Sequence, residues 1–305
     1  MIGSRASRLA LWQAEYVKGR LRDAGIECRI ETIRTSGDRI TDRPLAAFGG
    51  KGVFVKEIEE ALLAGRIDLA VHSLKDLPTA QPEGLAIVCV PEREDPRDIL
   101  VARGAPALAT LPQAAVVGTG SPRRACQIRA ARPDLVLKDL RGNVDTRLAR
   151  LARGEYDAVV LALAGVRRLD AAVEGTVLAF DQMLPAVGQG ALAIEARAGD
   201  GEVRGILRPL HHPATACAVA AERAFLRGLG GGCQAPIAAV GEIRGDRLLL
   251  RGLVGDADGG VIVGDRREGP ASGPEDLGRD LAAALLARGA DALVRRSVAA
   301  PPEAP

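Results

Sequence analysis

The chain has few aromatic residues and almost no net charge. Phe, Trp and Tyr together make up 2% of the 305 residues, while 47% of the residues are hydrophobic, so the cores must be built from Leu, Val, Ile and Ala. A formal net charge of +2 gives no global reason to expect nucleic-acid or membrane binding. No apolar run approaches the roughly 20 residues that a membrane span needs. We expect a globular protein of two or three domains.

Cysteine and histidine are also scarce. The five cysteines are widely spaced, odd in number, and form no Cys-x-x-Cys pair, so the sequence predicts neither a disulfide framework nor a zinc site. His72, His211 and His212 are too scattered to predict a metal cluster. Residues 1–5 do not form the basic and then apolar pattern of a signal peptide. We therefore expect a cytoplasmic protein without a metal ion.

Strand-like and helix-like segments alternate in the first part of the chain. Apolar periodicity predicts a helix over 9–21, a strand over 26–30, a helix over 53–64 and a strand over 68–72. The stretch 37–52 contains Gly and Pro and is predicted to be a mobile loop. This alternation favours βαβ units and a mainly parallel sheet.

A second alternating region follows a charged, proline-containing segment. Residues 91–98 are predicted to cross between domains, and strands are predicted near 115–118, 135–138 and 158–162. The strand predicted over 191–196 is expected to return to the first domain, because little chain remains before the next unit.

The last part of the chain changes character. Two helices flank three strand-like runs that are separated by Gly/Asp turns, which predicts an antiparallel sheet. The predicted helices are 214–227 and 274–288, the strands are 237–243, 248–254 and 261–266, and 299–305 is a frayed tail.

Together these segments predict an α/β protein. We expect two doubly wound domains of the kind found in periplasmic binding proteins, plus a smaller α+β C-terminal domain with a three-stranded antiparallel sheet. The expected domains are 1–91 with 191–208, then 97–185, then 213–305.

Several strand–helix junctions carry anion-binding side chains. After a predicted strand, Ser121 can cap a helix and Pro122 fits the first position of that helix. The free backbone N–H groups at this helix start, together with the forked donors of Arg123 and Arg124, favour binding of a carboxylate or phosphate. Similar junctions contain further candidates: Arg5, Ser7, Thr119, Arg141, Asn143, Arg147 and Arg168. Strand ends share one edge of an open sheet, so a polyanion between two domains is the predicted ligand. The alternative is that these arginines are solvated.

Two further segments contain candidates for chemistry. Ser73, Lys75 and Asp76 follow a predicted buried strand, where a carboxylate can stabilise a developing cation or move a proton, or simply cap a helix. Cys233 lies in a glycine-rich loop, where an accessible thiol can be a nucleophile or an attachment point, or only a small residue in a tight turn. The other four cysteines are expected to be core residues, and His72 is expected to be structural.

The ordered set of these segments resembles the hydroxymethylbilane synthase (porphobilinogen deaminase) family over nearly the whole chain. One such segment would be weak, but the order and spacing of the whole set are specific. The matching stretches are 5–7, 9–13, 49–52, 71–76, 93–98, 118–124, 140–143, 185–190, 222–225 and 231–236.

The resemblance implies a transferase of tetrapyrrole (haem) biosynthesis. Four porphobilinogen molecules would lose ammonia and join head to tail, and water would release linear hydroxymethylbilane. A dipyrromethane cofactor, held by a thioether to Cys233, would prime the chain and stay on the enzyme. Asp76 matches the catalytic aspartate and would stabilise the azafulvenium-like cation formed as ammonia leaves.

The resemblance also assigns binding residues and partners. Residues that match cofactor-binding positions are Ser73, Lys75, Thr119, Ser121, Arg123, Arg124, Arg141, Asn143, Arg147, Arg168 and Gln189. Residues that match substrate-binding positions are Arg5, Ser7, Gln13, Arg141, Arg147 and Arg168. The family implies a monomer that binds porphobilinogen and the growing polypyrrole and passes its product to uroporphyrinogen-III synthase.

The chain departs from the family pattern at three residues. Two other functions would also explain parts of the sequence. Gly120 replaces a frequent serine, Ala47 replaces a frequent loop lysine, and Ala238 replaces a glycine after the cysteine motif. A solute-binding module would explain two α/β lobes but not the third domain or the Cys233 loop. A thiol enzyme that uses Cys233 directly would need a base, and no histidine is near it in sequence.

Overall fold

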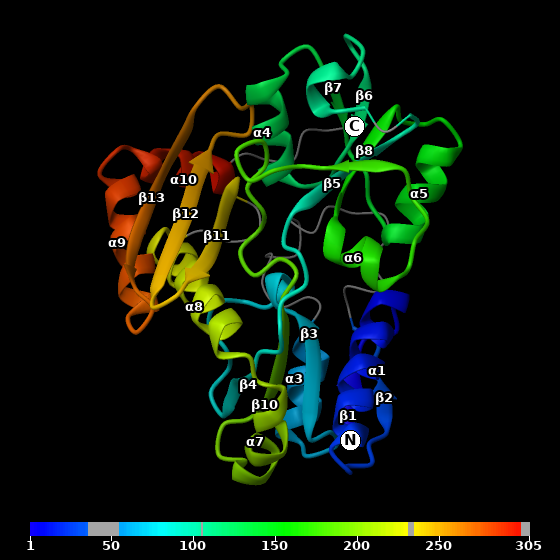
Figure 1. The fold of residues 1–305 in the computed structure, drawn as a ribbon, viewed down its shortest axis with the longest axis vertical. Helices are drawn as coiled ribbons and strands as arrows, with labels where there is room; N and C mark the ends of the chain where they lie inside the picture. Colours follow the sequence, from blue (N-terminus) through cyan, green and yellow to red (C-terminus); the bar gives the residue numbers. More distant parts are fainter. Residues whose placement is uncertain (36–54, 105, 231–234, 300–305) are drawn as a thin grey trace. The chain divides into compact units, whose positions relative to one another are not determined.

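The protein is described by a computed structural model that covers residues 1–35, 55–104, 106–230 and 235–299. The predicted loop over 37–52 and Cys233 lie outside these residues. Contacts divide the chain into two compact units (Figure 1). Unit 1 comprises Met1–Glu94 and Gly190–Cys217, and unit 2 comprises Asp95–Gln189 and Ala218–Pro305. The first division falls within the segment 91–98 that was predicted to cross between domains.

Unit 1 is built on a five-stranded sheet with the order β2-β1-β3-β10-β4. Its strands are β1 (Ile2–Ser4), β2 (Ile30–Thr32), β3 (Leu69–Ser73), β4 (Leu85–Cys89) and β10 (Leu192–Arg197). Its helices include α1 (Arg8–Asp23), α3 (Lys56–Leu63) and α7 (Gly201–Leu207), with short 3-10 helices η2 (Leu74–Asp76) and η4 (Arg208–Leu210). The predicted return of the strand near 191–196 is confirmed, because β10 pairs with β3 and β4.

Helices cover both faces of this sheet. Alternate residues of a strand point to opposite faces, so Val71 packs in the core that α1 and α7 share, while Ala70 packs in the core formed with α3. Val17 and Leu21 supply the α1 side, and Ile58 supplies part of the α3 side. This burial on both faces explains why the strands read as short apolar runs in the sequence.

The sheet is mixed but mainly parallel, as predicted: β2, β1, β3 and β4 run in one direction and β10 opposes them. β1 pairs in parallel with β2 and β3, whereas β10 runs antiparallel to both β3 and β4. The strand predicted over 26–30 begins only at Ile30. Strand β4 was not predicted, because it has no distinctive alternation, and the direction of β10 depends on its pairing with distant residues, which local periodicity does not detect.

Unit 2 contains a second five-stranded sheet with the order β7-β6-β8-β5-β9. Its strands are β5 (Asp98–Ala102), β6 (Val116–Gly118), β7 (Val136–Lys138), β8 (Ala158–Ala162) and β9 (Gly175–Val177). Helix α4 (Pro122–Ala131) packs in one core, and α5 (Val144–Ala152) and α6 (Leu163–Arg168) pack in the other; η3 (Leu108–Thr110) is a short 3-10 helix. β5 runs antiparallel to both β8 and β9.

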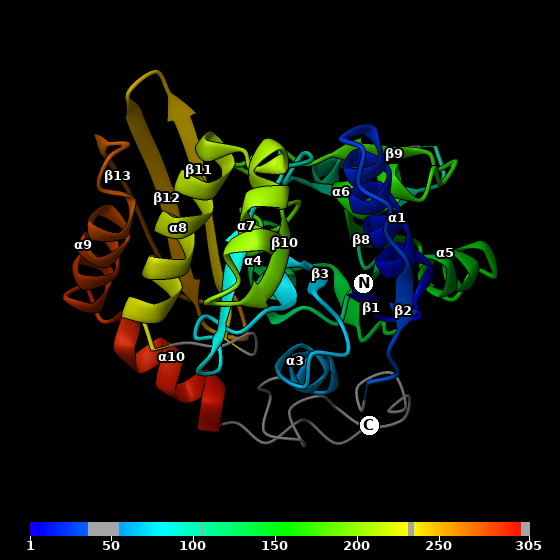
Figure 2. The same ribbon diagram turned by 90° about the horizontal axis from the view of Figure 1, so that it is seen from below.

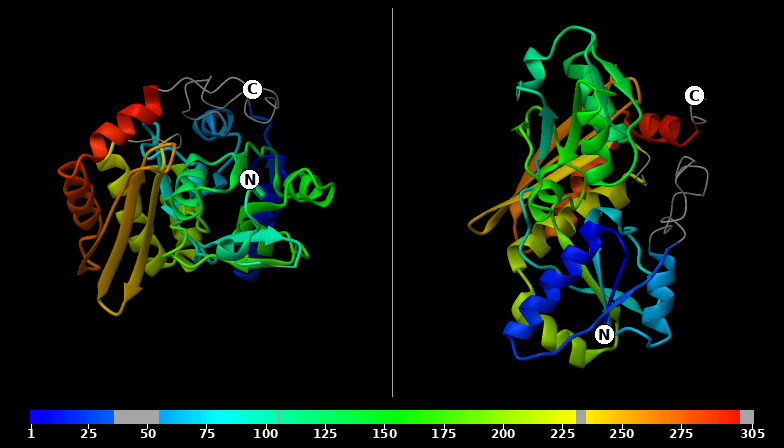
Figure 3. Two further views of the ribbon diagram at one scale, coloured as in Figure 1. Left: turned by 90° about the horizontal axis from the view of Figure 1, so that it is seen from above. Right: turned by 90° about the vertical axis from the view of Figure 1, so that its right-hand side faces the viewer.

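The C-terminal part of unit 2 has the predicted three-stranded antiparallel sheet. Its elements are β11 (Ile237–Arg244), β12 (Arg247–Gly255), β13 (Ile262–Pro270), α9 (Pro274–Leu286), α10 (Ala290–Ala299) and the part of α8 (Pro213–Gly228) from Ala218 onward. Figure 2 shows the C-terminal strands with α8 and α9, and Figure 3 shows α10 next to α9. Gly278 lets α9 approach α8 closely, since a Cβ there would lie 2.3 Å from the carbonyl oxygen of Ala221.

The fold class predicted from the sequence is confirmed: two α/β sheets of the doubly wound kind and one antiparallel α+β region. No helix among the described residues is both long and apolar enough to cross a membrane.

Candidate functional site

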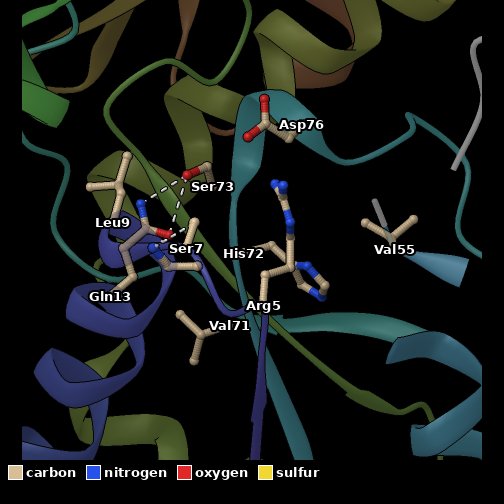
Figure 4. Close-up of a pocket in the computed structure, with 10 residues that line it drawn as sticks. Arg5, Ser7, Leu9, Gln13, Val55, Val71, His72, Ser73 and Asp76 are labelled. Carbon is tan, nitrogen blue, oxygen red and sulfur yellow. Dashed lines mark hydrogen bonds between the residues drawn. The ribbon is translucent and has the colours of Figure 1, made fainter. Parts of the chain in front are cut away.

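A pocket opens in unit 1 at the carboxyl ends of β1 and β3. It holds about 420 Å³ of space, part of it open to solvent. Figure 4 shows its lining side chains, which come from the β1–α1 junction, α1, the end of β3, η2 and the start of α3: Arg5, Ser7, Leu9, Ala10, Gln13, Val55, Val71, His72, Ser73 and Asp76. Five predicted site residues therefore line one pocket. Lys75 lies beside them, half-buried in η2.

One wall of the pocket is held by hydrogen bonds between α1 and β3. The amide of Gln13 donates from Nε2 to Ser73 Oγ at 2.8 Å, and Ser73 Oγ lies 3.2 Å from Gln13 Oε1 (Figure 4). Ser7 caps α1, because its Oγ accepts from the backbone N–H of Ala10 at 3.3 Å. These contacts fix the polar side chains of Ser7, Gln13 and Ser73, all of which line the pocket.

Opposite charges lie in this pocket. Figure 4 shows the Arg5 side chain extending toward the end of the pocket where Asp76 lies. Asp76 ends η2, is exposed, and makes no hydrogen bond or ion pair with the described residues, so the alternative that it caps a helix is not supported. A ligand with both a carboxylate and a developing positive charge would match this arrangement.

His72 lies between the pocket and a buried carboxylate. Its Nε2 is 3.1 Å from Glu195 Oε2, and the two side chains are 4% and 0% exposed. Glu59 of α3 is close enough for its pKa to be raised by burial and by Glu195. The pair supports the prediction that His72 has a structural role, and sequence reasoning missed Glu195.

In unit 2, Arg123 and Arg124 turn toward a buried carboxylate. Arg123 donates from Nη1 to Asp98 Oδ2 at 2.7 Å, and Arg124 donates from Nη2 to Asp98 Oδ1 at 2.7 Å. Each arginine side chain is 6% exposed and Asp98 is fully buried. Burial alone would raise the pKa of Asp98, but the two guanidinium groups hold it well below its usual range.

Other predicted residues support the same network. Gln189 donates from Nε2 to Asp98 Oδ1 at 2.9 Å and to the Pro96 carbonyl at 2.7 Å. Ser121 caps α4 as predicted, with its Oγ 3.5 Å from the N–H of Arg124, and Thr119 Oγ1 accepts from the N–H of Ser121. The structure thus gives Gln189, Ser121 and Thr119 each a hydrogen-bond partner within the protein. Contact between these side chains and a ligand stays a prediction.

The remaining unit 2 candidates lie around α5 and α6. Arg141 is exposed and donates to Asp139 at 2.6 Å, Asn143 caps α5 through the N–H of Thr146 at 2.8 Å, and Arg147 donates to the Gly142 carbonyl. Arg168 ends α6 and is buried. Their shared contact with a polyanion stays a prediction.

Two of the four described cysteines, Cys89 and Cys126, are core residues as the sequence predicts. Cys89 and Cys126 are fully buried, and burial raises the pKa of Cys89 to about 12 and that of Cys126 to about 11. Cys28 and Cys217 are partly buried, and burial raises the pKa of both. Four thiols are therefore poor nucleophiles at neutral pH. Cys233 lies outside the described residues.

Comparison with known families identifies both parts of the chain. Residues 1–205 match the family model described as "Porphobilinogen deaminase, dipyromethane cofactor binding domain", and residues 216–287 match "Porphobilinogen deaminase, C-terminal domain". The chain belongs to the porphobilinogen deaminase family. This membership favours the deaminase over the solute-binding module and the thiol enzyme as the function of the chain.

Individual relatives agree with the porphobilinogen deaminase family. A porphobilinogen deaminase of Roseiflexus castenholzii is 53% identical over 296 residues, which cover 96% of this chain and 97% of that protein. A porphobilinogen deaminase of Roseiflexus sp. is 54% identical over 298 residues, which cover 96% of this chain and 98% of that protein. Among solved structures, an ancestral cationic amino acid solute-binding protein is 15% identical with a TM-score of 0.43, covering 68% of this chain and 86% of that one.

Sequence reasoning missed the acidic partners of the unit 2 arginines, which are Asp98 and Asp139, and of His72, which is Glu195. Asp98 lies in the matching stretch 93–98, but its charge suggested only a crossing between domains. Asp139 and Glu195 had no motif of their own. In each case the signal available was a lone acidic residue within or next to an apolar run, which does not reveal its partner.

Proposed function

We propose that the chain is a porphobilinogen deaminase that builds hydroxymethylbilane from four porphobilinogen molecules. The observation that carries this proposal is the unit 1 pocket, where the carboxylate of Asp76, which has no partner among the described residues, and the cation of Arg5 line one space in a chain of this family. Porphobilinogen carries two carboxylates and an aminomethyl group, so it presents both charges that the pocket complements.

Asp76 would stabilise positive charge on the substrate. As the C–N bond of the aminomethyl group breaks and ammonia leaves, the pyrrole gains positive charge, and an ionised carboxylate nearby lowers the free energy of that state. Asp76 is available for this role because it makes no ion pair with the described residues. Arg5 would hold a substrate carboxylate, with Ser7, Gln13 and Ser73 contributing hydrogen bonds.

The described residues of unit 2 fit a covalently attached dipyrromethane with its carboxylates. Two guanidinium groups contact a single carboxylate in the Asp98 network, so the network carries one excess positive charge and favours an anion. When bound, the cofactor supplies the terminal pyrrole to which the first substrate is joined. Cys233 would hold it, and further contacts from unit 2 would come from Thr119, Ser121, Arg123, Arg124, Arg141, Asn143, Arg147, Arg168 and Gln189.

The cellular setting follows from the same proposal. We infer a cytoplasmic enzyme that works as a monomer and releases a linear tetrapyrrole. An unstable linear product of this kind must be consumed by an enzyme that closes the ring, and uroporphyrinogen-III synthase is the expected recipient.

Intact mass spectrometry tests the proposal. Wild-type protein should carry a mass excess equal to two linked pyrroles, and Cys233→Ala should not carry it. Cys28→Ala is the matched control, because Cys28 is a partly buried thiol in another part of the fold and should leave the excess in place. An unmodified wild-type protein with full activity would contradict the proposal, as would an excess that persists in Cys233→Ala.

A further inference from the structure

An acidic side chain lies beside one of the candidate ligand-binding arginines at the end of β7. Arg141 donates from Nε to Asp139 Oδ2 at 2.6 Å. The residue between them, Leu140, is fully buried, whereas the Arg141 and Asp139 side chains are 44% and 56% exposed. Burial of Leu140 therefore leaves both charged side chains at the surface, where they form an ion pair two residues apart in the sequence.

The backbone that carries Asp139 is held by neighbouring elements of unit 2. The Lys138 carbonyl accepts from the N–H of Thr119 at 3.0 Å, and the Asp139 carbonyl accepts from the Tyr156 hydroxyl at 2.8 Å. Because β6 and β7 run parallel, Gly120 and Asp139 lie next to each other just beyond the carboxyl ends of the two strands. Ligands of open α/β sheets bind at this edge.

Gly120 leaves the space that the Asp139 carboxylate occupies. A Cβ at position 120 would lie 2.8 Å from Asp139 Oδ1 and 3.0 Å from the Leu140 carbonyl oxygen, both closer than van der Waals contact. Gly120 is also one of the residues at which the chain departs from the family pattern. The place that a serine side chain would fill at position 120 is therefore taken by Asp139 in this chain.

The ion pair uses only part of the Arg141 guanidinium. Arg132, which also has an aspartate two residues away, donates to Asp134 from both Nε and Nη2, at 2.7 and 2.6 Å. Arg141 donates to Asp139 from Nε alone, and its Nη nitrogens make no hydrogen bond with the described residues. A carboxylate that contacts two donors of a guanidinium binds more strongly than one that contacts a single donor. A ligand carboxylate can therefore replace Asp139 on Arg141.

The exposure of the pair makes this exchange easy. Exposed ion pairs contribute little free energy, and a released Asp139 would be hydrated, so a ligand that breaks the pair loses little. The Asp139 carboxylate also lowers the positive potential at this edge of the sheet, which limits how tightly the edge holds a polyanion. A growing pyrrole chain gains two carboxylates with every unit, so this limit favours release of the finished chain.

We propose that Asp139 is a positioning residue that competes with the carboxylates of porphobilinogen and of the growing pyrrole chain for Arg141. While no ligand carboxylate is present, Asp139 keeps the guanidinium oriented through the Nε contact. An arriving carboxylate takes the donors of Arg141, and Asp139 turns into solvent. Gly120 belongs to the same arrangement, because it leaves room for Asp139. The inference rests on the proposed function, which names the ligand of Arg141.

Steady-state kinetics of the cofactor-loaded enzyme tests the competition. Asp139→Asn keeps the shape of the side chain and removes its charge. The KM for porphobilinogen should fall about two- to fivefold, the range that an exposed ion pair contributes, while kcat should stay the same or fall because product release is slower. Glu174→Gln is the matched control, an exposed acidic residue next to β9 at the other end of the same sheet, and should change neither constant.

The salt dependence of KM is a second readout, which a merely structural role of Asp139 would not change. Salt screens exposed charges, so the difference in KM between wild type and Asp139→Asn should shrink at least twofold between about 0.05 M and about 0.5 M salt. The same series with Glu174→Gln corrects for the general effect of salt on the enzyme.

A double-mutant cycle tests the part that Gly120 plays, without any need for activity. Gly120→Ala should lower the melting temperature of the wild-type protein by ~2–4 °C, because the new Cβ meets both Asp139 and the Leu140 carbonyl. In the Asp139→Ala background the same substitution should lower it by less than half as much, because one of the two close contacts is absent.

Three results would overturn the inference. They are a KM of an active Asp139→Asn enzyme that equals or exceeds that of wild type, a fall in KM that salt does not reduce, and additive changes of melting temperature in the cycle. A wild-type protein that does not convert porphobilinogen would instead overturn the proposed function. In that case the cycle still tests whether Gly120 makes room for Asp139.

Discussion

The β1–α1 junction of unit 1 and the β6–α4 junction of unit 2 have similar local sequences and different surroundings. Each has a serine cap on its helix and arginine close by. Arg5 is only half-buried and lines an open pocket, whereas Arg123 and Arg124 are 6% exposed and turn toward a carboxylate inside the fold. Similar motifs therefore give one open site and one internal network.

The position of the acidic residue explains the difference. In unit 1, Asp76 ends η2 beyond the strand, where it stays exposed and makes no pair with the described residues. In unit 2, Asp98 is the first residue of β5 and lies opposite Ala162 in the sheet, so it is fully buried. A buried carboxylate must be paired, and it therefore draws nearby arginines inward. An exposed one remains available for chemistry.

The largest effect is expected at the open site. Asp76→Ala should lower kcat by roughly 10²–10³-fold, because the stabiliser of the developing cation is lost. The melting temperature should stay close to that of wild type, since Asp76 is exposed. Steady-state production of hydroxymethylbilane, with circular dichroism as a check of folding, measures both. Glu83→Ala is the matched control, an exposed acidic residue of unit 1 away from the pocket. Near-normal turnover by Asp76→Ala would refute the role of Asp76.

The buried carboxylate should show the opposite behaviour, with a large effect on stability. Asp98→Asn should cost ~3–5 kcal/mol of unfolding free energy at pH 7, because two buried arginines lose their anionic partner. Glu268→Gln, which breaks the exposed pair with Arg247, should cost less than ~1 kcal/mol. Urea unfolding measures both. Equal costs would show that burial does not distinguish the two carboxylates.

The pairing of Asp98 with Arg123 and Arg124 also predicts how stability depends on pH. The pKa of Asp98 is lowered in the fold, so its pairing contributes stability above the unfolded pKa of about 4 and loses that contribution as the pH falls toward the folded pKa. The difference in unfolding free energy between wild type and Asp98→Asn should therefore be constant from about pH 7 to pH 5 and shrink below about pH 4. A difference that grows on acidification would contradict this assignment.

The smallest effects are expected at the helix caps that the junctions share. Ser7→Ala and Ser121→Ala should each cost about 0.5–1 kcal/mol, because their hydrogen bonds to backbone N–H groups are long, at 3.3 and 3.5 Å. Asn143→Ala should cost more, since its cap bond to Thr146 is 2.8 Å. Thermal unfolding ranks the three. A large difference between the serines would mean that the junctions are less alike than their sequences.

Much of the local structure could be predicted from the sequence, but the long-range pairings could not. The α1 periodicity, the cap at Ser121, and the alternating strands of the C-terminal sheet all depend on neighbours in the sequence. The antiparallel pairings of β5 with β8 and of β10 with β3 depend on residues far apart, so local patterns do not reveal them. The motif order predicted the family, which the comparisons confirmed.

The sequence by itself determined where strands pass into helices, which side chains stand at those junctions, and the family to which the chain belongs. Only the tertiary structure decided what each junction does. It brought Asp98 to two arginines more than twenty residues later in the chain, and it left Asp76 exposed beside Arg5 in a pocket. The physical reason is that the free energy of a charge depends on burial and on its partner, and both are set by how distant segments pack.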